Sequence, residues 1–206
     1  MISVATDAAP PHHPRRLLAA QPTSALSAAA SVQTVTLAAL IASAFSAIVL
    51  LIAIVTRVAL ATQARNWLHY TFPGVPHRVG AAMGIFANNS RELLGVLGLL
   101  LIAQLAARRC EGPARAQLMV RTGGEVLLAG AIAINLLVVG AAVGGYGGRM
   151  VRAMLPHGPV EVSAFALALA LYLNGRSRPL TGLQMAITIA ASVALLAAAA
   201  FLETFR

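Results

Sequence analysis

Long apolar runs constrain this chain more than any other feature of its sequence. They cover residues 32–60, about 83–107, about 125–146 and 183–205. A bilayer core of about 30 Å is crossed by roughly 20 helical residues, so each of these runs is long enough to span it. Hydrophobic residues make up 59% of the chain and charged residues 10%, and a soluble domain of this length could not bury so much apolar surface. The sequence therefore predicts an all-α, polytopic membrane helix bundle.

A fifth apolar stretch is shorter and follows a break in the pattern. It covers residues 160–173 and comes after Pro156-His157-Gly158-Pro159. Counted over residues 159–174, it barely reaches the length that a bilayer requires. We therefore expect about five transmembrane helices, of which the fourth is short or is entered from a broken re-entrant segment. Between the first two spans, Trp67 and Tyr70 predict an elbow in the headgroup layer, which these side chains favour.

The two ends of the chain differ in composition. Residues 1–30 are rich in Pro, Ala, Ser and Thr, which predicts a flexible tail before a transmembrane domain over residues 31–206. The first apolar run is too long for the core of a signal peptide, so we interpret it as an uncleaved helix. With the N-terminus inside, the inner segments hold more arginines than the outer ones, which predicts a cytoplasmic N-terminus. Five spans then place the C-terminus outside.

The charge of the chain favours a lipid partner over a nucleic acid. The net charge is +9, and all 15 basic residues are arginine. This arginine usage, with the alanine richness, indicates a GC-rich bacterial source and thus a bacterial plasma membrane. The arginines stand singly or in pairs between apolar runs, an arrangement typical of loops anchored to anionic headgroups, and form no basic stripe for a nucleic acid. Cys110 is the single cysteine, so no intrachain disulfide forms.

A few polar residues within the apolar runs are the candidate site. Glu92, Glu161 and Glu203 lie within or at the ends of spans, where an ionised carboxylate costs roughly 2.5–3.5 kcal/mol and needs a partner, protonation or water. His157 and Glu161 are four residues apart, as are Asn88 and Glu92, so each pair can share a helix face. Asn135 lies in the middle of a span and needs a partner on another helix. The predicted polar site consists of His157, Glu161, Asn88, Asn89, Asn135 and Glu203.

Two interpretations of this site stay open. The polar residues either form a network that fixes helix register or handle a substrate or partner. Glu125 is expected at the N-terminus of the third span, where the helix dipole favours a carboxylate. No metal and no cofactor are predicted, because the sequence has neither a phosphate loop nor a hydrolase motif such as H-E-x-x-H. An intramembrane hydrolase using His157 and Glu161 is the weakest hypothesis.

Glycines spaced four residues apart predict close helix packing. Gly140, Gly144 and Gly148 form two overlapping G-x-x-x-G units, and Gly80 and Gly84 form another. Small residues at this spacing let helix backbones approach closely in lipid. We expect packing within the bundle, with a homo-oligomer contact as the alternative.

Four segments resemble a known family when taken in order. Residues 155–161 resemble the P-H-G-x-x-E signature of the stage II sporulation protein M family of bacterial membrane proteins. Residues 88–91 look like the asparagine-bearing start of its second span. Asn135 followed by Gly140 looks like its N-G-x-x-x-G stretch, and residues 198–203 look like its closing A-x-x-E segment. The resemblance covers residues 82–206. Leu136 and Pro159 depart from the family pattern.

The resemblance implies a helical membrane protein without established catalysis. Family members in sporulation work with peptidoglycan-degrading enzymes as a membrane anchor, and related proteins accompany the maturation and export of circular bacteriocins beside an ATP-binding subunit. We therefore expect a non-enzymatic scaffold whose partners are other membrane or envelope proteins. The alternative is the membrane subunit of a peptide maturation or export system that works with a separate ABC-type ATPase.

Overall fold

The protein is a bundle of long helices. The structure, a computed structural model, describes residues 23–72, 76–108, 114–176 and 179–205. Within these ranges five helices are long and apolar enough to cross a membrane, which confirms the predicted polytopic bundle. The elements in chain order are α1 (Thr23–Val55), the π-helical turn η1 (Thr56–Leu60), α2 (Ala61–Leu68), α3 (Val79–Arg108), α4 (Ala114–Tyr146), α5 (Gly148–Met154), α6 (Gly158–Gly175) and α7 (Gly182–Thr204).

Two helices begin earlier than the sequence pattern predicts. α1 begins at Thr23, so residues 23–30 are helical although we expected them in the tail, whereas residues 1–22 lie outside the described ranges. α4 begins at Ala114. Glu125 therefore lies three turns inside that helix, and the prediction that it stands at a helix N-terminus is wrong. Hydropathy marks where a helix enters the apolar layer and does not mark where the helix itself begins.

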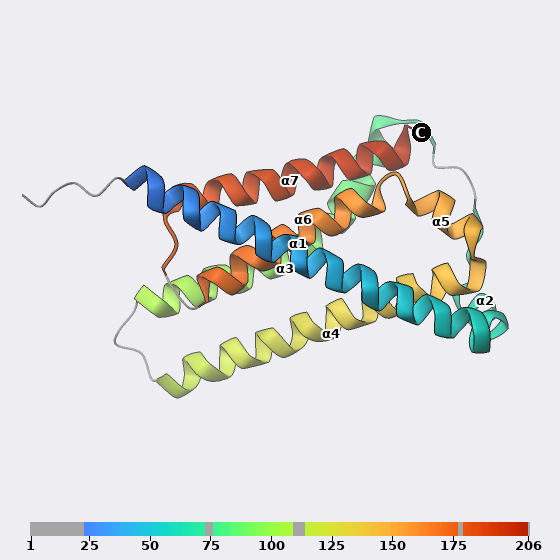
Figure 1. Ribbon diagram of the computed structural model, residues 1–206, viewed down its shortest axis with the longest axis horizontal. Helices are drawn as coiled ribbons and strands as arrows, with labels where there is room; N and C mark the ends of the chain where they lie inside the picture. Colours follow the sequence, from blue (N-terminus) through green and yellow to red (C-terminus); the bar gives the residue numbers. More distant parts are fainter. Residues whose placement is uncertain (1–22, 73–75, 109–113, 177–178, 206) are drawn as a thin grey trace, which may run out of the picture.

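The fourth span is short, as predicted, and is reached through a broken segment. α6 has 18 residues and is preceded by the seven-residue α5. α6 does not turn back within the bundle. Its first residues lie beside the end of α7, and its last residues lie beside the start of α7 (Figure 1).

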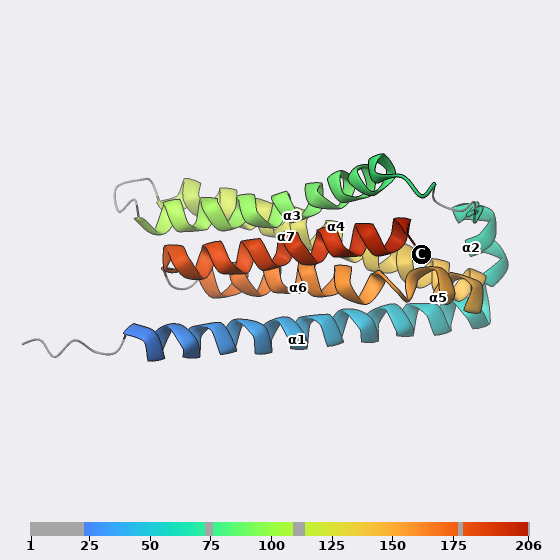
Figure 2. The ribbon, with the colours of Figure 1, turned by 90° about the horizontal axis from the view of Figure 1, so that it is seen from above.

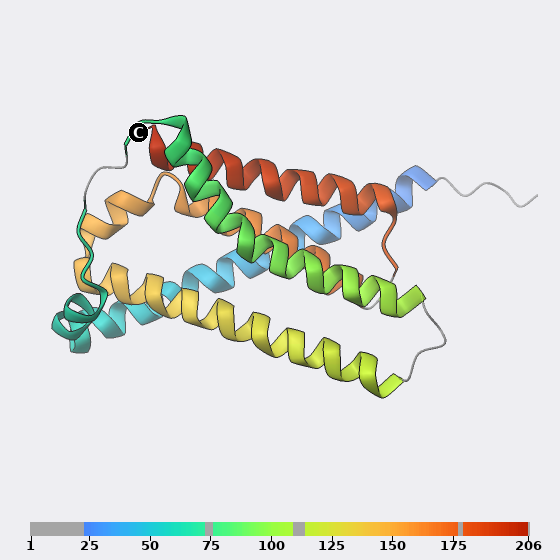
Figure 3. The ribbon, with the colours of Figure 1, turned by 180° about the vertical axis from the view of Figure 1, so that it is seen from behind.

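α6 forms the centre of the bundle. It contacts α1, α3 and α7, and Figure 2 shows α6 and α7 lying between α1 and α3. Because small side chains let several helices approach at once, the alanines of α6 are almost fully enclosed. The fully buried residues of α6 are Ala164, Ala166, Ala168, Ala170 and Leu171. Seen from behind, α3 runs obliquely from the C-terminal end of α7 toward the N-terminal end of α4 (Figure 3).

The glycines spaced four residues apart divide into packed positions on α4 and open positions on α3 and α5. A Cβ atom on Gly144 would lie 2.5 Å from the Ala53 carbonyl oxygen, and one on Gly140 would lie 2.6 Å from the Ile52 Cβ atom. These two glycines thus bring α4 against α1. A Cβ atom on Gly148 would meet nothing within 4 Å, and the same holds for Gly80 and Gly84. Small-residue spacing alone does not distinguish these cases.

An aromatic elbow closes one end of the bundle. The Tyr146 hydroxyl accepts a hydrogen bond from the Tyr70 backbone N–H at 2.8 Å, and the Tyr146 ring meets the Tyr70 and Phe72 rings edge-on. The Arg149 guanidinium lies 4.5 Å from the centre of the Phe72 ring. Trp67 is exposed nearby on α2, so this end has the aromatic and arginine side chains that favour the headgroup layer. The start of α1 and the end of α7 lie at opposite ends of the bundle (Figure 1).

Candidate functional site

The break between α5 and α6 positions the two signature side chains. α5 ends where the Leu155 backbone N–H donates to the Val151 carbonyl, and α6 starts at Gly158 with a proline in its first turn. Proline suits this place because its missing N–H would have no helical acceptor there. His157 becomes the N-cap residue and Glu161 falls in the first turn, where the helix dipole favours a carboxylate.

Three helices bring polar side chains together at this break. The Asn89 side-chain amide on α3 donates a hydrogen bond to the Glu161 carboxylate on α6. The His157 Nε2 atom lies 4.0 Å from a carboxylate oxygen of Glu203 on α7, and the two side chains are 14% and 31% exposed. We call Asn89, His157, Glu161 and Glu203 the inner group. The carboxylates of Glu92 and Glu203 also interact electrostatically with Glu161, so the surroundings of Glu161 are acidic.

The other predicted site residues lie apart from the inner group. The Asn135 side-chain amide on α4 donates a 2.9 Å hydrogen bond to Glu92 on α3. Both residues are exposed, and we call them the lateral pair. Asn88 is also exposed and makes no hydrogen bond within the described ranges. The six predicted residues therefore divide between the interior of the bundle and its outer surface.

The spacing along α4 places the lateral pair near the middle of the membrane. Glu125 binds two arginines whose side chains are 39% and 41% exposed, and Tyr146 belongs to the aromatic elbow, so these residues mark the two borders. Asn135 lies ten residues after Glu125 and eleven before Tyr146, which is about 15 Å from each at the rise of an α-helix. The apolar core is about 30 Å thick.

Asn89 and its partner Glu161 lie at nearly the same depth, whereas His157 and Glu203 lie nearer the aromatic elbow, at the N-cap of α6 and in the last turn of α7. Asn89 precedes Glu92 by three residues on α3, a rise of about 4.5 Å along the helix axis. An ionised side chain facing lipid at such depth costs roughly 2.5–3.5 kcal/mol. Polar groups are retained there when they are paired within protein or face a wet cavity, which makes both groups candidates for function.

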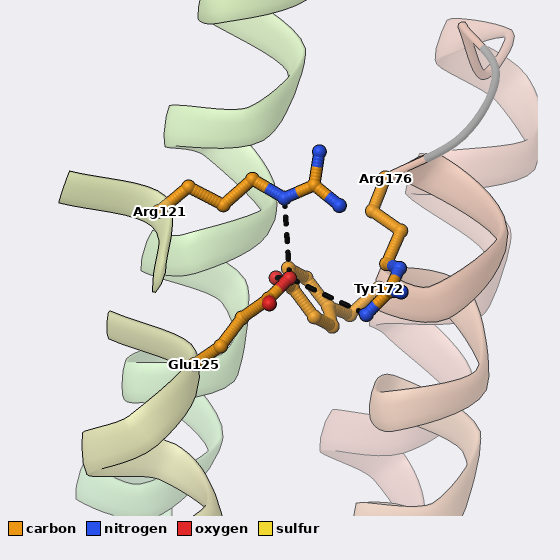
Figure 4. A network of polar contacts seen from close by, with 4 residues as sticks. All are labelled: Arg121, Glu125, Tyr172 and Arg176. Carbon is orange, nitrogen blue, oxygen red and sulfur yellow. Dashed lines mark hydrogen bonds and ion pairs between the residues drawn. The ribbon is translucent and has the colours of Figure 1, made fainter. Parts of the chain in front are cut away.

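A second polar network, which we did not predict from the sequence, lies near the opposite end of α6. The Tyr172 hydroxyl donates a 2.6 Å hydrogen bond to Glu125, and the guanidinium groups of Arg121 and Arg176 lie 3.2 and 3.4 Å from the same oxygen (Figure 4). The Arg121–Glu125 contact has the four-residue spacing of a helical ion pair, so the sequence held that signal. The link to α6 depends on tertiary packing.

Two smaller contacts complete that end of the bundle. The Gln104 side chain on α3 donates to the Gly175 carbonyl at 2.6 Å and accepts from the Leu180 backbone N–H at 3.4 Å. Thr34 on α1 is buried and accepts hydrogen bonds from the side chains of Asn174 and Gln184. These bonds satisfy the backbone at the end of α6 and connect it with α1 and α7, which indicates a structural role.

The chemistry available to the inner group is hydrogen bonding and charge pairing. Among the described residues, no three His, Cys, Asp or Glu side chains stand close enough together to hold a metal ion. The carboxylates of Glu161 and Glu203 are acceptors, so they suit a partner that offers N–H or O–H donors or a positive charge. No protein-family model, curated protein or solved structure matches the chain.

Proposed function

We propose that this protein is a non-enzymatic membrane scaffold that organises cell-envelope partners in a bacterial plasma membrane. The observation that supports the proposal is the inner group. Glu161 of α6 accepts a hydrogen bond from Asn89 of α3, and Glu203 of α7 lies beside His157. Both carboxylates are partly buried, Glu161 in the first turn of α6 and Glu203 in the last turn of α7, and a partly buried acceptor is costly unless a donor satisfies it. The resemblance of residues 155–161 to the stage II sporulation protein M family points to peptidoglycan-remodelling enzymes as partners.

The decisive variant is Glu161→Gln. Glutamine keeps the shape of glutamate and an oxygen that accepts the Asn89 amide, so the bond between α3 and α6 is preserved. It removes the negative charge. A scaffold that recruits a donor-bearing or basic partner through Glu161 should accumulate at the normal level in membranes and lose that partner.

The matched control is Asn135→Leu, which removes the donor from the lateral pair. Glu92 then loses the hydrogen bond from α4, so this variant should fail through low membrane abundance while the remaining folded protein keeps its partner. The measurement is affinity purification from native membranes, with the captured partner normalised to the amount of bait. Full partner capture by Glu161→Gln at normal abundance would remove the inner group from the proposal.

The identity of the captured proteins distinguishes the scaffold from the export hypothesis. Peptidoglycan hydrolases among them would support the scaffold. A separate ATPase with a precursor peptide would replace it by the membrane subunit of a maturation or export system.

A further inference from the structure

One face of α3 carries polar and small residues and is exposed among the described residues. Asn88 and Arg91 are exposed on this face and make no hydrogen bond or ion pair within the described ranges. Arg91 is adjacent to Glu92 of the lateral pair, so it lies close to the middle of the membrane. An arginine at this depth normally faces protein or a wet cavity, because lipid solvates its charge poorly.

The spacing of the exposed residues matches a helix-packing seam. Their positions alternate in steps of four and three residues, which is the repeat that keeps one helix face against a second helix. A Cβ atom on Gly84, Gly95 or Gly98 would meet nothing within 4 Å, so the backbone of α3 is open to close approach by another helix. We call this face the α3 seam, and it consists of Gly84, Asn88, Arg91, Gly95, Gly98 and Ile102.

Charge complementarity favours a second copy of this chain as the partner that covers the α3 seam. Two copies in one membrane have the same orientation, so a two-fold axis along the bilayer normal brings their α3 helices together in parallel and at equal depth. In such packing a residue at the d position, which Arg91 occupies three residues after Asn88, inserts among four residues of the facing helix, including the one that follows its counterpart. Arg91 of each copy then meets Glu92 of the other. Two reciprocal pairs result, and neither charge remains exposed to lipid.

We propose that the protein forms a parallel homodimer through the α3 seam, with Arg91 of each copy paired to Glu92 of the other. The dimer is independent of the proposed scaffold function, because the inner group lies on the opposite, inward side of α3 with Asn89. Each copy would still present its own inner group to a partner. Gly140 and Gly144 pack α4 against α1 within the bundle, whereas a Cβ atom on the glycines of α3 would meet nothing within 4 Å.

Cysteine cross-linking in native membranes tests the geometry. The chain has one cysteine, so Cys110→Ser gives a background in which each new cysteine is the only one. Asn88→Cys, Gly95→Cys and Gly98→Cys should form disulfide-linked dimers on mild oxidation. Leu94→Cys and Leu101→Cys are matched controls, since both residues are exposed on α3 beside the seam. They should give little dimer.

Paired charge reversals test the proposed contact. Arg91→Glu alone and Glu92→Arg alone each place like charges together in the dimer and should weaken self-association at least about tenfold. Coexpression of the two variants restores both opposite-charge pairs between unlike copies, so a mixed dimer should reappear and co-purify through a tag on one of them. This rescue also shows that each variant folds.

Several results would overturn the dimer. Equal cross-linking at positions 94 and 95 would mean random collision, and no cross-linking at any seam position would mean that lipid covers the face. A seam cysteine that links to a different protein would replace the second copy by that partner. Failure of these tests would leave partner capture by the inner group unaffected, so the two proposals can fail separately.

Discussion

The close contact between α1 and α4 makes Gly144→Ala a sharp test of the fold. The added Cβ atom would lie 2.5 Å from the Ala53 carbonyl oxygen and 2.6 Å from the Thr56 Cβ atom. Contacts under 3.0 Å are essentially never seen for real Cβ atoms, so the helices must separate by at least about 0.5 Å, the difference between 3.0 and 2.5 Å. Neither obstacle is the far end of a flexible side chain, so no rotamer change relieves the clash.

The expected loss of stability follows from two opposing effects. Overpacking at such a site costs about 1–3 kcal/mol, whereas replacing a mid-helix glycine by alanine returns about 0.5–1 kcal/mol. Gly144→Ala should therefore lower the free energy of unfolding by about 1 kcal/mol, the difference between the middles of these two ranges. The assay is reversible unfolding in mixed micelles with increasing SDS, followed by the fluorescence of Trp67, the single tryptophan.

Gly148→Ala is the matched control for this experiment. Gly148 has the same four-residue spacing, yet a Cβ atom there would meet nothing within 4 Å. This variant should be as stable as the wild type or slightly more stable. Equal stability of the Gly144 and Gly148 variants would refute the packing of α4 against α1.

Three further predictions concern the polar contacts and the topology. Tyr172→Phe removes the 2.6 Å hydrogen bond to Glu125 and should lower the free energy of unfolding by about 1.5–3 kcal/mol, the usual range for a bond to a charged group; an unchanged SDS midpoint would contradict the bond. Asn135→Leu leaves Glu92 without its donor and should reduce membrane abundance, measured by quantitative immunoblotting, whereas a normal level would mean that Glu92 is satisfied elsewhere. Reporter fusions at the N-terminus and after α7 should report opposite sides of the membrane, and a common side would exclude five spans.

The number of spans was predictable because lipid imposes one simple requirement on the sequence. A helix must present about 20 apolar residues to cross the bilayer, and this requirement is visible in the chain without any tertiary information. The start of α1 at Thr23 and of α4 at Ala114 was not predictable in this way. Helices continue beyond the apolar layer, where composition no longer separates helix from loop.

The candidate site was predictable only in part. Gly158 and Pro159 correctly indicated a helix that starts at the break, since a helix start depends on local chain geometry. That Asn89 would meet Glu161 while Asn88 would face outward depends on the rotation of α3 about its axis. This rotation is set by packing against α6 and α7, and a single sequence does not encode it in any local pattern. The bond between Tyr172 and Glu125 was not predicted either, because it depends on how α4 and α6 pack together.

The alanines of α6 have a consequence for how that helix keeps its position. Four of the seven buried residues of α6 are alanines, whose short side chains form low ridges, while larger side chains such as Leu171 and Phe165 provide the interlocking with its neighbours. Polar contacts at the two ends of α6 therefore add to this packing in fixing the position of the helix along its axis. Asn89 hydrogen-bonds to Glu161 in the first turn of α6. In the last turns, Tyr172 bonds to Glu125 and the Gly175 carbonyl accepts from Gln104. These contacts restrict movement of α6 along its axis and rotation about it. Releasing the contacts at one end would make such movement between α1, α3 and α7 easier.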